Sequence, residues 1–168
     1  MDNETKMQKS TEKALKKLIS EEIIAVDFYV GCLGSVMCEE RKFIEEKFTE
    51  IMLDERDDHL QKLVKFARES YCDEFEVPFK YKDIEKYASN KCVSTFNKLK
   101  RGEHAAYYIE KAIEIEKDAI ASYEEVLEDE WVSAEANAIL LNIYYDEVQH
   151  LQELELLLQC CTMGVYLA

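Results

Sequence analysis

Glycine and proline are scarce in this chain of 168 residues, which contains 4 glycines and 1 proline. An average protein uses these two residue types at about 12% of its positions. Because tight turns and β-bulges depend on them, their scarcity argues against a β-sandwich and against a many-stranded α/β fold. Apolar residues make up 48% of the sequence and charged residues 34%, which favours long amphipathic helices and argues against intrinsic disorder.

Positive charge is also in short supply, because 21 lysines and arginines face 36 acidic residues and leave a formal charge of −15. Such a surface repels nucleic acids and anionic membranes and attracts cations. The first 18 residues are a local exception with more lysines than acidic residues. We interpret them as a solvated helix start rather than as a DNA-binding arm.

Motifs of several other protein classes are missing. The 6 cysteines form no Cys-x-x-Cys pair, which argues against rubredoxin-type iron sites, zinc ribbons and thioredoxin-like motifs. The polar N-terminus lacks the apolar core of a signal peptide, and no run of about 18 apolar residues could span a membrane. We therefore expect a cytoplasmic protein with reduced thiols, folded as a single domain over residues 1–168.

Helical periodicity runs through four segments, at about 10–37, 40–70, 104–129 and 134–160. Only a few residues separate the two segments of each half, and Ser133 is the expected N-cap of the last one. Short connections make consecutive helices antiparallel. Residues 71–103 contain Pro78 and have weaker periodicity, so they should form a long crossover with a short helix or two. The predicted fold is all-α, an antiparallel four-helix bundle of two hairpins.

Each predicted helix carries a glutamate on its apolar seam, where a bundle core requires apolar side chains. Burial of an isolated carboxylate costs on the order of several kcal/mol, whereas a pair of divalent metal ions would offset the charge of four carboxylates. The candidate ligands on or beside the four seams are Glu22, Glu55, Asp58, His59, Glu116, Glu147 and His150. These residue types at these positions predict a buried two-metal site.

The four glutamates also lie at matching heights in the two hairpins. The midpoint between Glu22 and Glu55 falls in the first turn, and the midpoint between Glu116 and Glu147 falls in the second. At 1.5 Å per residue, each glutamate lies roughly 23–25 Å from its turn. Chance would seldom place both pairs of glutamates at equal heights, so the spacing supports one shared site.

The two halves of the chain resemble each other beyond these glutamates. Tyr29 follows the first glutamate by the same interval as Tyr123 follows the third, and an Asp-Glu pair precedes His-Leu-Gln in both halves. We interpret this as an internal duplication of a metal-binding hairpin. The tyrosines could bond to ligands or pass electrons, although core packing is the simpler interpretation. Asp54 and Asp146 are either partners of the ligands or solvated charges.

Over about residues 10–160 the chain resembles the ferritin-like superfamily, whose motif is Glu, Glu-x-x-His, Glu and Glu-x-x-His. Glu22 fits the first position, Glu116 the third, and Glu147-Val-Gln-His150 the fourth. The second position departs from the motif because the sequence from residue 55 to 59 is Glu-Arg-Asp-Asp-His.

Two residues compete for the histidine position of that second motif. In a regular helix Asp58 would occupy it, whereas a one-residue π-bulge would place His59 there. The apolar residues that follow, Leu63 and Phe66, continue the phase of His59 and favour it. Both residues remain candidates at this point.

The resemblance implies two iron ions per subunit, with manganese as an alternative, and oxidation of Fe(II) by O2 or H2O2. Glu55 and Glu147 would bridge the ions, Glu22 and Glu116 would be terminal or bridging carboxylates, and His150 with His59 or Asp58 would be terminal ligands. Iron storage, detoxification or protection against oxidative stress would follow, in a homo-oligomer between a dimer and a cage. The alternatives are a rubrerythrin-like peroxidase or di-iron oxygenase with a separate electron donor, and a non-catalytic helical structural protein.

Overall fold

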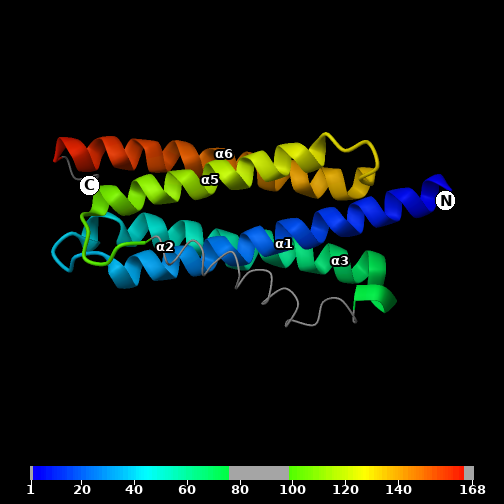
Figure 1. Cartoon of the computed structure of the whole chain (residues 1–168), viewed down its shortest axis with the longest axis horizontal. Coiled ribbons are helices and arrows are strands. Elements are labelled where there is room, and N and C mark those ends of the chain that lie inside the picture. Colours follow the sequence, from blue (N-terminus) through cyan, green and yellow to red (C-terminus); the bar gives the residue numbers. More distant parts are fainter. Residues whose placement is uncertain (1, 76–98, 165–168) are drawn as a thin grey trace.

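The computed structural model describes residues 2–75 and 99–164, and all elements within these ranges are helical. Two pairs of long helices lie side by side along one direction (Figure 1). The predicted short helices of the crossover, together with Pro78, lie outside the described residues. Within the described ranges, every helix is too short or too polar to span a lipid bilayer.

The first pair consists of α1 (Asn3–Ser35) and a rod built from α2 (Glu45–Asp54), η2 (Glu55–His59) and α3 (Leu60–Phe75). A short turn that includes the 3-10 helix η1 (Arg41–Phe43) joins the two and reverses the chain (Figure 1).

Three boundaries of this first pair differ from the predicted ones. Helix α1 begins at Asn3 rather than near residue 10, because the side chain of Asp2 caps it by accepting a hydrogen bond from the Thr5 amide. The regular second helix begins at Glu45 rather than near 40, since the 3-10 turn precedes it. It continues to Phe75 rather than ending at 70.

The second pair consists of α5 (Ala105–Leu127) and α6 (Ala134–Met163), which pack against each other along their length (Figure 1). Ser133 caps α6 as predicted, because its hydroxyl accepts a hydrogen bond from the Ala136 amide at 3.2 Å. Gly164 ends α6 in the left-handed conformation, with φ of 67°, which suits a residue without a Cβ.

The apolar core is divided into two clusters along the bundle axis. One contains Phe28 and Phe48 with the early part of α5 and the late part of α6. The other contains Leu15 and Leu63 with the late part of α5 and the early part of α6. Between them, the middle of every long helix or rod contributes buried polar side chains. The fold thus encloses a polar centre between two apolar layers.

Candidate metal centre

The polar centre is built from four glutamates and two histidines, each no more than 4% exposed. Helix α1 supplies one of them, η2 two, α5 one and α6 two. The six residues are Glu22, Glu55, His59, Glu116, Glu147 and His150. Six of the seven candidate ligands from the sequence therefore meet in one buried cluster.

The cluster divides into two overlapping groups that could each hold a metal ion. Glu22 and His59 belong to one group, and Glu116 and His150 belong to the other. Glu55 and Glu147 belong to both. Within each group the ligand atoms lie within 4.8 Å of one another. Carboxylates that are shared in this way can bridge neighbouring cations.

The histidines contact the carboxylates through their Nδ1 atoms. Nδ1 of His59 lies 3.0 Å from Oε1 of Glu147 and 3.5 Å from carboxylate oxygens of Glu22 and Glu55. Nδ1 of His150 lies 3.2 Å from Oε1 of Glu55. The two imidazole rings stack with their centroids 5.6 Å apart. Nδ1 of each histidine therefore points into the carboxylate cluster, where a metal ion would bind.

One polar atom of every residue in this cluster is buried and lacks a hydrogen-bond partner. These atoms come close to one another without the geometry of a hydrogen bond. Buried polar atoms in this state are costly, and a cation that accepts their lone pairs would remove the cost. Carboxylate and imidazole donors suit iron, manganese and zinc. The donor set of the cluster therefore fits divalent metal ions.

A π turn brings His59 into the cluster. In η2 the Leu60 amide donates to the carbonyl of Glu55, a hydrogen bond one residue longer than in an α-helix. His59 is consequently 1% exposed, and Leu63 continues its phase into the core. Asp58 lies on the outer side with a side chain 47% exposed and pairs with Lys62.

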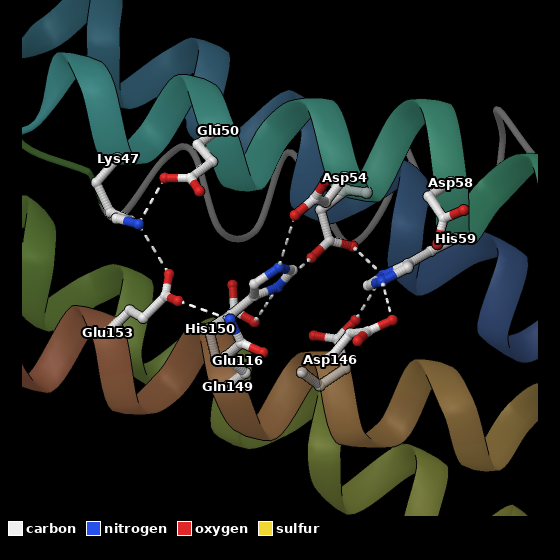
Figure 2. A network of polar contacts seen from close by, with 12 residues as sticks. Lys47, Glu50, Asp54, Asp58, His59, Glu116, Asp146, Gln149, His150 and Glu153 are labelled. Atoms are coloured by element: carbon white, nitrogen blue, oxygen red, sulfur yellow. Dashed lines mark hydrogen bonds and ion pairs between the residues drawn. The ribbon is translucent and has the colours of Figure 1, made fainter.

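Each histidine has an aspartate beside its other nitrogen. Nε2 of His150 lies 3.4 Å from Asp54, and Nε2 of His59 lies 3.5 Å from Asp146 (Figure 2). Each aspartate comes from the hairpin opposite the histidine that it faces. A carboxylate in this position fixes the orientation of a ligating imidazole. Both aspartate side chains are also about half exposed, so each faces a histidine and solvent at once, and both roles that the sequence leaves open for them fit the structure.

Two buried tyrosines hold the glutamates that are not shared. The hydroxyl of Tyr29 donates a hydrogen bond to Glu116, and the hydroxyl of Tyr123 donates one to Glu22. Both tyrosines are 0% exposed, so they also pack in the core. The equal Glu-to-Tyr interval in the two halves was the sequence signal for this pair of contacts, although the interval alone did not identify the partner of either hydroxyl.

Burial and mutual repulsion set the pKa values in the cluster. Desolvation and the charge of Glu22 raise the pKa of Glu55 well above its usual range, and desolvation and Glu147 do the same to Glu116. Burial and the charges of Glu55 and Glu22 raise the pKa of Glu147 to about 8.

The pKa shifts of Glu22 and His59 follow from their close polar contacts inside the cluster. Burial would raise the pKa of Glu22, but its close polar contacts with Glu55 and His59 and the hydrogen bond from Tyr123 outweigh burial and lower that pKa. Burial alone would lower the pKa of His59, but the surrounding glutamates raise it. Without a cation, the cluster therefore retains protons at neutral pH that a metal ion would displace.

Comparisons with protein-family models, with curated proteins and with solved structures found no match for this chain. The support for a function therefore comes from the residues of the cluster themselves.

Proposed function

We propose that this chain is a ferritin-like di-iron protein that binds two iron ions in the buried cluster and oxidises Fe(II) with O2 or H2O2. One observation carries the proposal. Six unpartnered buried atoms point into two overlapping donor groups that share Glu55 and Glu147. The proposal includes the ferritin-like arrangement, with two antiparallel hairpins related by an internal duplication.

Charge balance favours two divalent ions over one. The cluster contains four carboxylates, so two divalent cations leave it electrically neutral when every carboxylate is ionised and the histidines are uncharged. A neutral group is much cheaper to bury than a cluster with residual charge. Glu22 and His59 would hold one ion, and Glu116 and His150 the other. Glu55 and Glu147 would contact both ions.

Iron bound in this cluster would supply the electrons that reduce the oxidant, one from each Fe(II). The protein side chains would fix the geometry and the dielectric environment. Tyr29 and Tyr123 hold two of the carboxylates by hydrogen bonds, and Asp54 and Asp146 face the outer nitrogens of the histidines. The apolar clusters on both sides exclude bulk water, which strengthens the electrostatic interactions inside.

An anaerobic Fe(II) titration followed by addition of oxidant tests this function. We expect about two Fe(II) per chain, and then a ferric absorbance after O2 or H2O2 is added. The His59→Ala variant should lose at least half of the iron, whereas Asp58→Asn should bind as the wild type does. Less than about one metal ion per two chains after loading would overturn the proposal.

Three further measurements on the same samples separate the finer alternatives. Titration with Mn(II) under the same conditions compares the two metals. Light scattering detects a mineral-filled particle, which supports iron storage. Steady turnover of H2O2 with an added electron donor and no mineral would instead favour a rubrerythrin-like peroxidase.

A further inference from the structure

One face of α6 points away from the bundle and contains no charged residue over its whole length. The nine residues that follow each other along this face at steps of three and four are all exposed. At 100° per residue they fall within about 80° of each other around the helix axis. They form the α6 stripe: Ala134, Ala138, Leu141, Tyr145, Gln149, Gln152, Leu156, Gln159 and Met163.

The α6 stripe gathers exposed apolar side chains that the rest of the surface has few of. Leu141, Tyr145, Leu156 and Met163 are 42%, 60%, 52% and 75% exposed. Elsewhere in residues 2–70 and 99–164 only Met7, Val30 and Leu53 are large, apolar and exposed to a comparable degree. Apolar side chains that line up on one helix face, in a surface otherwise rich in charge, indicate a contact with another protein surface.

Three of the four exposed or partly exposed acidic residues of α6 beside the stripe, all but Glu135, are directed to partners within the same chain. Glu153 pairs with Lys47 at 2.8 Å, Glu155 lies 3.9 Å from Lys117, and Asp146 faces His59. The stripe itself therefore offers a neutral surface on a chain whose net charge is −15. Two copies of so acidic a chain repel each other least where charge is absent.

We propose that the α6 stripe is a dimer interface in which it packs antiparallel against the α6 stripe of a second copy of this chain. The spacing supports a copy as the occupant, because eight of the nine stripe residues, all but Gln149, form pairs equally far from the helix midpoint. Leu141 would contact the partner's Leu156, and Tyr145 the partner's Gln152. Ala134 would lie opposite the partner's Met163, a small residue against a large one. A two-fold interface requires such self-complementarity.

This pairing overlaps the two helices along their full length, about 45 Å at 1.5 Å per residue. It leaves the metal ligands on the opposite side of α6 untouched, so it does not depend on the proposed iron chemistry. An experiment can therefore refute the proposed interface without refuting the proposed function, and the reverse.

Sedimentation equilibrium of the metal-free full chain tests the interface. We expect the wild type to be a dimer, or a larger assembly built from dimers. In Leu141→Glu/Leu156→Glu each glutamate faces another glutamate, and the dissociation constant should rise at least about 100-fold. Met7→Glu, which adds the same charge at a residue 40% exposed on α1, should leave the mass unchanged.

A charge-swapped variant tests the antiparallel register. Leu141→Lys/Leu156→Glu places a lysine against a glutamate at both ends, so the dimer should reappear. Parallel pairing would instead oppose like charges. Far-UV circular dichroism checks that each variant is folded, and Tyr145→Arg provides a second disruption if the double glutamate variant does not fold. A monomeric wild type at about 100 µM, an unchanged mass in folded disrupted variants, or a monomeric charge-swapped variant would each overturn the proposal.

Discussion

The hydroxyl of Tyr29, on α1, donates a hydrogen bond to the carboxylate of Glu116, on α5. The reciprocal bond runs from Tyr123, on α5, to Glu22, on α1. Each of these glutamates is therefore held by a tyrosine from the hairpin to which it does not belong. The two hairpins are joined through their functional residues as well as through their apolar surfaces.

Removal of one of these hydroxyls should destabilise the metal-free protein. Tyr29→Phe leaves a buried carboxylate oxygen of Glu116 without its donor, which we expect to lower the free energy of unfolding by about 1–3 kcal/mol. Urea unfolding monitored by circular dichroism measures the change. Tyr144→Phe is the matched control, because it removes a hydroxyl that donates to Glu124 at the surface, where water can replace the bond, and its effect should be small. Equal effects of the two substitutions would contradict the role of the Tyr29 hydrogen bond.

The stability of the metal-free protein should fall as the pH rises from 5 to 8. Burial raises the pKa of Glu55 and of Glu147, so the folded state binds more protons than the unfolded state across this interval. The raised pKa of His59 acts in the same direction above its unfolded value. Thermal unfolding at several pH values measures how steeply the stability changes with pH.

The Glu55→Gln variant isolates one contribution to this change of stability with pH. Glutamine cannot ionise, so the variant should gain stability over the wild type, and the gain should be larger at pH 8 than at pH 5. The variant should also lose metal binding, because Glu55 contributes its carboxylate to both donor groups. Glu50→Gln, on the exposed part of α2, serves as the control. If the stability of the wild type and of Glu55→Gln changed equally with pH, this result would argue against a raised pKa of Glu55.

Metal binding should release protons at neutral pH. The protons on Glu55, Glu116 and His59 occupy the places that a cation would take. Isothermal titration of Mn(II) in two buffers of different ionisation enthalpy gives the number released. We expect more than one proton per chain, and an affinity that decreases as the pH is lowered. An identical heat in both buffers would show that no net proton is released.

The π turn should tolerate the loss of one residue. Deletion of Asp57 would leave Glu55-Arg-Asp-His, the Glu-x-x-His spacing of the second half, with the His59 side chain still directed into the cluster. We expect a cooperative thermal transition and retained metal binding. Deletion of Lys62, in regular helix, should instead rotate Leu63 and Ala67 out of the core by about 100° and abolish cooperative unfolding. If both deletions unfold the protein, the π turn is not a removable insertion.

Much of the fold and of the cluster follows from sequence periodicity. The heptad pattern reports which face of each helix is buried, so it identified the glutamates and histidines that lie among apolar residues. The phase of Leu63 and Phe66 favoured His59, and the π turn has the corresponding geometry. Periodicity failed at the start of α1, because residues 3–9 are almost all polar and carry no apolar pattern.

Contacts between helices were harder to predict. Periodicity assigns a side chain to a face but does not say which residue lies opposite it on another helix. The hydroxyl of Tyr29 therefore had no identifiable partner in the sequence, and the orientation of Asp54 and Asp146 toward the histidines was equally undetermined. These contacts depend on the relative height and rotation of two packed helices, which only the folded structure provides.

Both donor groups take residues from both halves of the chain. A bound ion would consequently act as a reversible cross-link between segments that are far apart in the sequence, and it could not bind with full affinity to either half alone. Loading with metal should then raise the barrier to separating the hairpins rather than the stability of any one helix. The resistance of the chain to proteolysis would in that case report how much metal is available to it.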